Sequence, residues 1–108
     1  MTERYTARHA LESVAKSYDG EYAVLLEHGS MQLGCYKPQR IDKQRAHDRD
    51  EIYVIQAGSG VFFLNGDRRP FEPGEALFVP AGIEHRFEDF SDDFSAWVIF
   101  YGPSGGES

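Results

Sequence analysis

Two histidines and one glutamate stand out in this sequence as side chains that could bind a metal ion together. His47 and Glu51 lie four residues apart, and Glu51 opens a largely apolar segment. Because side chains alternate along an extended chain, Arg45, His47 and Glu51 would share one face there with Tyr53 and Ile55. The last two are typical core residues, so the three polar side chains are expected to point into the interior near its mouth.

A carboxylate in that position needs a cation, because an unpaired buried one commonly costs more than about 3 kcal/mol. His47, Arg45 and a metal ion are the three cations open to Glu51. His85 favours the metal, since it follows the rigid turn Pro80-Ala81-Gly82 and enters a second predicted strand. Two imidazoles and one carboxylate suit iron, manganese, zinc, nickel or copper. The spacing alone leaves a second interpretation open, which is a pair of hydrogen-bonded structural histidines.

The elements that must position these residues are short strands. Extended segments separated by turn residues follow one another from residue 21 onward: 21–27, 31–37, 51–56, 60–64, 75–79, 87–90 and 94–101. Asn65-Gly66 is a strong signal for a tight hairpin turn, because both residues accept a positive φ. Many short strands with glycine-containing turns predict an all-β sandwich or barrel over residues 21–101. Residues 102–108 have nothing to bury and are predicted to form a disordered tail.

One short helix is predicted ahead of the strands, within residues 1–20. Apolar residues recur there at helical spacing, at Ala7, Leu11, Val14 and Tyr18. Thr6 is the expected N-cap, and Gly20 is the expected C-terminal stop. We expect this helix to cover an edge or mouth of the fold.

Several predicted strands are apolar on both faces, notably residues 61–64 and 97–101. A lone antiparallel barrel would show one of those faces to water. The second face must therefore be covered by the N-terminal helix or by another subunit, and we predict a homodimer.

Composition limits the class of protein. A chain of 108 residues is one domain, and its 41% hydrophobic content is enough for a packed core. The formal charge of −7 argues against nucleic acid as a partner. Cys35 is the single cysteine and is expected to be a buried, inert thiol. The apolar runs are too short for a membrane span and the first 20 residues lack a signal core, so we predict a cytoplasmic protein that is not bound to a membrane.

Two sequence blocks resemble the motifs of the cupin superfamily. Arg45-Ala46-His47 is followed by three residues, Glu51, six residues and Gly58, which is similar to the first motif. Gly74 is followed by five residues, Pro80-Ala81-Gly82, two residues, His85, three residues and Asp89, which is similar to the second. The resemblance covers about residues 22–101 and is of the small, single-domain cupin 2 type. It implies a double-stranded β-helix, or jelly roll.

The resemblance implies that His47, Glu51 and His85 bind one divalent metal ion. Arg45 stands where the first motif has its leading histidine, and it cannot ligate a metal because it stays protonated. Gln44 could fill the vacancy through its carbonyl oxygen if the loop bulges. Arg45 itself could grip a substrate carboxylate, lie solvated on the loop, or pair with Glu51 in a barrel without metal.

The fold does not choose among the reactions of this superfamily. We expect an enzyme that uses the metal to act on a small organic molecule inside the barrel, by oxygenase- or isomerase-like chemistry. The predicted cavity lining is aromatic: Tyr53, Phe63, Phe78 and Phe87. The alternatives are a non-catalytic cupin that binds or senses a small ligand, and a purely structural barrel.

Overall fold

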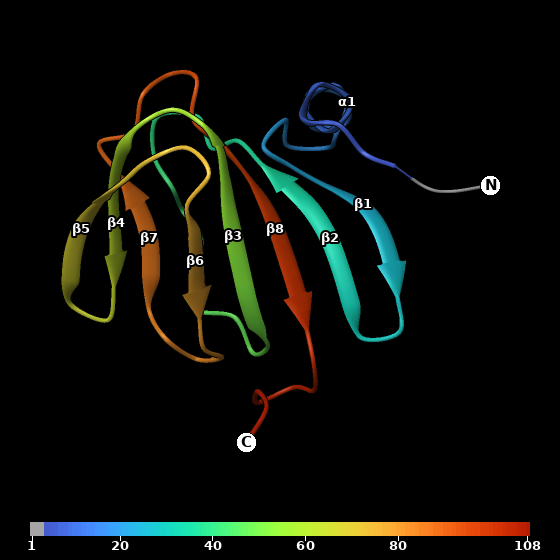
Figure 1. The fold of residues 1–108 in the computed structure, drawn as a ribbon, viewed down its shortest axis with the longest axis vertical. Coiled ribbons are helices and arrows are strands. Elements are labelled where there is room, and N and C mark those ends of the chain that lie inside the picture. Colours follow the sequence, from blue (N-terminus) through green and yellow to red (C-terminus); the bar gives the residue numbers. More distant parts are fainter. Residues whose placement is uncertain (1–3) are drawn as a thin grey trace.

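The computed structural model describes residues 4–108, and strands dominate them (Figure 1). The elements are α1 (Ala7–Ala15), β1 (Tyr22–His28), β2 (Met31–Tyr36), β3 (Asp50–Ala57), β4 (Gly60–Leu64), β5 (Asp67–Phe71), β6 (Ala76–Val79), β7 (His85–Glu88) and β8 (Ser95–Tyr101). Each expected extended segment is a strand, and no end of a strand is shifted by more than two residues. The prediction of an all-β, single-domain barrel with one short N-terminal helix is confirmed.

The strands form two antiparallel sheets. The five-stranded sheet has the order β1-β2-β8-β3-β6, and the three-stranded sheet has the order β5-β4-β7. In Figure 1 the three-stranded sheet stands beside β6 and β3, while β1 and β2 lie on the other side, next to α1. The main core is largely aromatic and draws on both sheets: Tyr53, Ile55, Phe62, Phe71, Val79, Phe87, Phe94, Ala96 and Val98.

Strand β5 is the one strand that the sequence pattern did not indicate. Four of its five residues are exposed, so the period-two alternation of apolar side chains is absent. Pro70 lacks a backbone N–H, and it is tolerated because β5 is an edge strand of its sheet. Residues 67–71 therefore become a strand because the Asn65-Gly66 turn pairs them with β4. The pattern of their own side chains does not favour a strand.

The N-terminal helix is shorter than predicted. Thr6 is the N-cap, as expected, and its side chain accepts a hydrogen bond from the backbone N–H of His9. The helix ends at Ala15, so the predicted extension through Tyr18 to Gly20 is wrong. The Ser17 hydroxyl donates to the carbonyl of Val14 and accepts from the N–H of Gly20, which turns the chain away. Tyr18 is consequently exposed.

Helix α1 covers one end of the outer face of the five-stranded sheet. Its buried residues Ala10 and Val14 pack against Cys35, with Trp97 beside them. Cys35 is free and buried, as predicted, and burial raises the pKa of its thiol to about 11. Within residues 4–108 no helix has the length and apolar character needed to cross a membrane.

The C-terminal segment differs from the expected disordered tail. The N–H of Gly105 donates to the carbonyl of Asp48, and the N–H of Glu107 donates to the carboxylate of Asp50. The Ser104 hydroxyl also donates to Asp48. Backbone N–H groups thus bind residues 104–107 to the segment around Asp48 and Asp50. The prediction of a disordered tail used only composition, which does not reveal such hydrogen bonds.

Candidate metal centre

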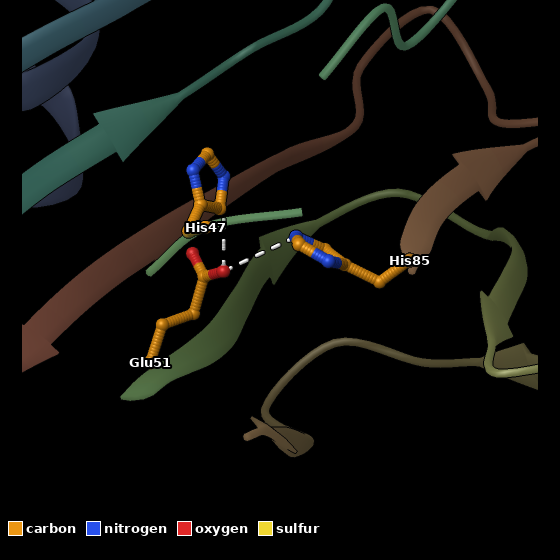
Figure 2. A group of neighbouring side chains, drawn as sticks. All are labelled: His47, Glu51 and His85. Atoms are coloured by element: carbon orange, nitrogen blue, oxygen red, sulfur yellow. Dashed lines mark ion pairs between the residues drawn. The ribbon is translucent and has the colours of Figure 1, made fainter. Parts of the chain in front are cut away.

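His47, Glu51 and His85 converge at one point inside the barrel. Figure 2 shows both imidazoles beside the same carboxylate, with dashed lines that mark their ion pairs with it. The Nε2 atoms of His85 and His47 lie 3.1 Å and 3.9 Å from Oε1 of Glu51. One ligand atom from each residue lies within 4.8 Å of the other two, a spacing that could hold a metal ion. His85 and Glu51 are buried, whereas the side chain of His47 is 35% exposed.

Hydrogen bonds between two separate loops bring these residues together. His47 precedes β3 and Glu51 is its second residue, while His85 begins β7. The carbonyl of His47 accepts from the N–H of Gly82, and the carboxylate of Asp50 accepts from the N–H of Ala81. Gly82 has a φ of +79°, a conformation that favours glycine. The turn before His85 is thereby hydrogen-bonded to His47 and to Asp50, the residue next to Glu51.

The hydrogen bonds of His85 determine which of its nitrogens faces Glu51 with a lone pair. Its Nδ1 lies 2.9 Å from the carbonyl oxygen of Ile83, which can only accept, so Nδ1 carries the hydrogen. In neutral His85 the lone pair is therefore on Nε2, which lies 3.1 Å from Oε1 of Glu51, 3.1 Å from Oε1 of Gln44 and 3.2 Å from the hydroxyl of Tyr53. Neither carboxylate oxygen of Glu51 has a hydrogen-bond partner among the described residues. Nε2 of neutral His85 and the carboxylate oxygens of Glu51 are all hydrogen-bond acceptors. They need a cation between them, which is either a proton on His85 or a metal ion.

The two imidazoles differ in proton affinity. Burial lowers the pKa of His47 below the usual value of 6.5, and the nearby Glu51 only partly offsets it. Burial also acts to lower the pKa of His85, but contact with Glu51 and with the carbonyl of Ile83 outweighs it, and the pKa is raised. Without a metal, His85 is thus the residue that takes up the proton.

Gln44 reaches this centre from the loop before β3. Its Oε1 lies 3.1 Å from Nε2 of both His47 and His85, and it accepts a 2.7 Å hydrogen bond from the hydroxyl of Tyr53. Its side-chain N–H donates to Asp42 at 2.6 Å. Asp42 is a buried residue that sequence reasoning missed, because nothing distinguishes it from the other acidic residues of this loop.

Arg45 does not point inward. It is exposed, and the ion pairs of Glu51 are with the two histidines. The expectation that Arg45 shares a face with His47 and Glu51 is wrong, because the chain is irregular from Asp42 to Arg49 and becomes a strand only at Asp50. The alternative of a barrel built on an Arg45–Glu51 pair is therefore not the arrangement observed.

A cavity of about 200 Å³ adjoins the two histidines and Glu51. Its lining combines polar and aromatic residues from the concave side of the larger sheet and the loop before β3: Tyr22, Tyr36, Gln44, His47, Glu51, Tyr53, Val98 and Phe100. The sequence had singled out only part of this set, because Tyr22, Tyr36, Val98 and Phe100 look like any other strand residues.

The predicted aromatic lining is correct only for Tyr53. Phe87 lies one layer deeper, with its ring centroid 4.9 Å from that of Tyr53. Phe63 carries the guanidinium groups of Arg68 and Arg86 over its ring, at 4.6 Å and 4.2 Å. Phe78 is 52% exposed and lines a different groove. Strand parity explains the last error, since Phe78 pairs with Ile52, which points away from the face of Glu51 and Tyr53.

Comparison with protein families matches residues 32–100 to the cupin domain. The chain belongs to the cupin family. An uncharacterized protein from Streptomyces coelicolor is 30% identical over 95 residues, covering 86% of this chain and 90% of that protein. An acireductone dioxygenase of Parvibaculum lavamentivorans is 29% identical over 126 residues, covering 95% of this chain and 68% of that enzyme.

Solved cupin structures share the fold. A cupin 2 conserved barrel domain protein from Salinispora arenicola superposes with a TM-score of 0.69, covering 94% of this chain and 89% of that one, at 18% identity. The arrangement of the two sheets is therefore that of a cupin barrel.

Proposed function

We propose that this cupin binds one divalent metal ion through His47, Glu51 and His85 and uses it as an enzyme on a small organic molecule. The observation that carries the proposal is the buried Glu51 carboxylate, which faces two imidazole nitrogens and has no hydrogen-bond partner among the described residues. An unpaired buried carboxylate is costly, and a divalent cation between these atoms removes the cost. Three protein ligands also leave positions open for a substrate.

The cavity beside the centre supports a small substrate. Its volume of about 200 Å³ is below the range of about 300–1,000 Å³ usual for drug-sized ligands. The partly exposed His47 connects the centre with solvent. Aromatic walls and one polar end are suited to an organic molecule that places oxygen atoms toward His47 and Glu51 and its carbon frame against Phe100.

The tyrosines around the cavity are held as neutral phenols. Burial, assisted by Glu51, raises the pKa of Tyr22 to about 12, and burial raises the pKa of Tyr36 and Tyr53 as well. The hydroxyls of Tyr22 and Tyr36 donate to Gln32 and Asp42. Their oxygens stay able to accept a hydrogen bond from a substrate hydroxyl, and all three tyrosines line the cavity.

A bound divalent ion would supply Lewis-acid polarisation of a substrate oxygen, or redox chemistry if it is iron, manganese or copper. The similarity to acireductone dioxygenase supports oxygenase-like chemistry, with isomerase-like chemistry as the alternative. Iron, manganese, zinc, nickel and copper all stay candidates for the ion. We retain the cytoplasm as the predicted location.

Elemental analysis of protein purified without chelators or a nickel column tests the metal. We expect about one equivalent per chain in the wild type and in His28→Ala, which removes an exposed histidine outside the group of three ligands, and none in Glu51→Ala or His85→Ala. Equal metal content in all four proteins would contradict the proposed ligands. Turnover that disappears in the two metal-free variants supports the enzyme. A ligand that raises the melting temperature without any product would instead indicate a sensor or binding cupin.

A homodimer is also proposed, from an apolar row on the outer face of the five-stranded sheet. The register of the strands aligns one residue from each strand across the sheet: Phe78, Ile52, Ile99, Leu33 and Leu26. Phe78 is 52% exposed and the other four are partly exposed, because α1 covers the neighbouring row. This row bears no charge in a chain of net charge −7, so two copies would repel each other least when they meet there.

A further inference from the structure

We propose that the side-chain oxygen of Gln44 is the fourth protein ligand of the metal centre and that Asp42 is the residue that positions it. This inference rests on the metal centre proposed above. Arg45 occupies the place of the leading histidine of the first cupin motif. In our proposal the amide oxygen of the preceding residue, Gln44, takes the role of that histidine as a ligand.

The distances between donor atoms support this assignment. Two ligands at right angles about an ion, each about 2.1 Å from it, lie about 3.0 Å apart, and two opposite ligands lie about 4.2 Å apart. Oε1 of Gln44 is 3.1 Å from Nε2 of His47 and 3.1 Å from Nε2 of His85. Oε1 of Glu51 is 3.1 Å from Nε2 of His85 and 3.9 Å from Nε2 of His47. The Gln44 oxygen is thus spaced from the imidazoles as closely as the Glu51 oxygen is.

Hydrogen bonds on the far side of Gln44 set the direction of its amide group. Its side-chain N–H donates to Oδ2 of Asp42 at 2.6 Å, and its backbone N–H donates to Oδ1 of the same carboxylate at 3.0 Å. A carboxylate can only accept, so the nitrogen of the amide faces Asp42 and the oxygen faces the histidines. The Tyr53 hydroxyl occupies one lone pair of that oxygen, and the other is available to an ion.

Asp42 is itself held rigidly. It is 6% exposed and accepts two further hydrogen bonds, from the hydroxyl of Tyr36 at 2.6 Å and from the backbone N–H of Phe87 in β7 at 2.8 Å. Phe87 lies two residues after His85, so Asp42 ties the loop of Gln44 to the strand that carries a ligand. Partners that orient a metal ligand in this way typically change metal affinity about 10- to 100-fold when they are replaced.

The exchange of imidazole for an amide oxygen alters the chemistry of the centre. The ligand set becomes two nitrogens and two oxygens. Oxygen ligands suit manganese and similarly hard ions better than a set dominated by imidazole does. We therefore expect Mn²⁺ to compete for this centre more effectively than the usual affinity order of divalent ions implies.

The test measures Mn²⁺ binding by calorimetry and the visible spectrum of bound Co²⁺. Gln44→Met keeps the length of the side chain and removes the oxygen, and Arg45→Met is the matched control in the same loop. We expect Gln44→Met to weaken Mn²⁺ binding at least about tenfold and to change the Co²⁺ spectrum, while Arg45→Met leaves both as in the wild type. An unchanged Co²⁺ spectrum in Gln44→Met would overturn the assignment.

Asp42→Asn tests the positioning role. Its amide group cannot accept all four hydrogen bonds, so the Co²⁺ spectrum is expected to shift toward that of Gln44→Met, a change that a loss of stability alone would not produce. A wild-type spectrum in folded Asp42→Asn contradicts the role, and if this variant does not fold, Gln44→Met alone decides the inference. A wild type that binds neither ion refutes the metal centre itself. Binding that is lost in His85→Ala but intact in Gln44→Met refutes only the fourth ligand.

Discussion

The Nε2 atom of His85 lies 3.1 Å from the Oε1 atom of Glu51, and both residues are buried. The carbonyl of Ile83 accepts a hydrogen bond from Nδ1, so in neutral His85 the nitrogen beside the carboxylate carries a lone pair and no hydrogen. A carboxylate and an imidazole in this orientation hold a cation between them. Without one they repel each other, and stability and metal binding must therefore oppose each other at this pair.

Glu51→Gln should separate these two effects. The new amide can donate to Nε2 of His85, so in EDTA at pH 8 we expect the free energy of unfolding to rise by about 1–3 kcal/mol. Metal binding should be lost in the same variant. Urea unfolding in EDTA measures the stability, with the exposed Glu27→Gln as a control expected to change it by less than about 0.5 kcal/mol. A less stable Glu51→Gln would show that the carboxylate is satisfied in the metal-free protein.

The stabilisation by metal should grow with pH. A raised pKa of His85 means that protonation favours the metal-free fold. That contribution is full below about 6.5 and is lost as the pH rises through the higher folded value. A metal ion must displace this proton, so its apparent affinity should increase up to about tenfold per pH unit between pH 6 and pH 8. Melting temperatures with Mn²⁺ and with EDTA should diverge over this range, and a constant difference would contradict proton competition at His85.

Gly58 of the first motif should tolerate no side chain. Its φ is +94°, and a Cβ there would lie 2.8 Å from the backbone nitrogen of Phe94. Gly29→Ala is the matched control, since its φ is +59° and nothing lies within 4 Å of its would-be Cβ. We expect Gly58→Ala to lower the free energy of unfolding by about 3 kcal/mol or more, and Gly29→Ala by about 1 kcal/mol. Equal losses in the two variants would mean that the backbone conformation alone, and no steric contact, requires Gly58.

Phe78→Asp should dissociate the proposed dimer. The substitution places a charge at the exposed end of an otherwise uncharged row, and two copies that meet along this row would desolvate that charge or bring the two charges together. Because Phe78 is 52% exposed, the fold of one chain should change in stability by no more than about 1 kcal/mol. Light scattering after size exclusion should give a dimer mass for the wild type and a monomer mass for the variant. A wild-type monomer at micromolar concentration would refute the dimer.

The sequence by itself determined the barrel and the convergence of His47, Glu51 and His85. Strand alternation is local, so the apolar pattern predicted nearly every strand. The spacing of the two motifs predicted that the three side chains converge, because each motif contains a turn and the first residues of a strand. Strand β5 escaped detection, since its exposed residues Asp67 to Pro70 lack that alternation.

Tertiary structure alone decided which neighbours complete the centre. The path of residues 42–49 depends on hydrogen bonds with partners far along the chain, such as that between Asp42 and Phe87. For this reason the expectation of an inward Arg45 failed, and the side chain of Gln44 lies beside the histidines instead. The cavity walls follow the same rule. Whether an aromatic residue lines a cavity, as Phe100 does, or faces outward, as Phe78 does, depends on strand register, which pairing between distant segments determines.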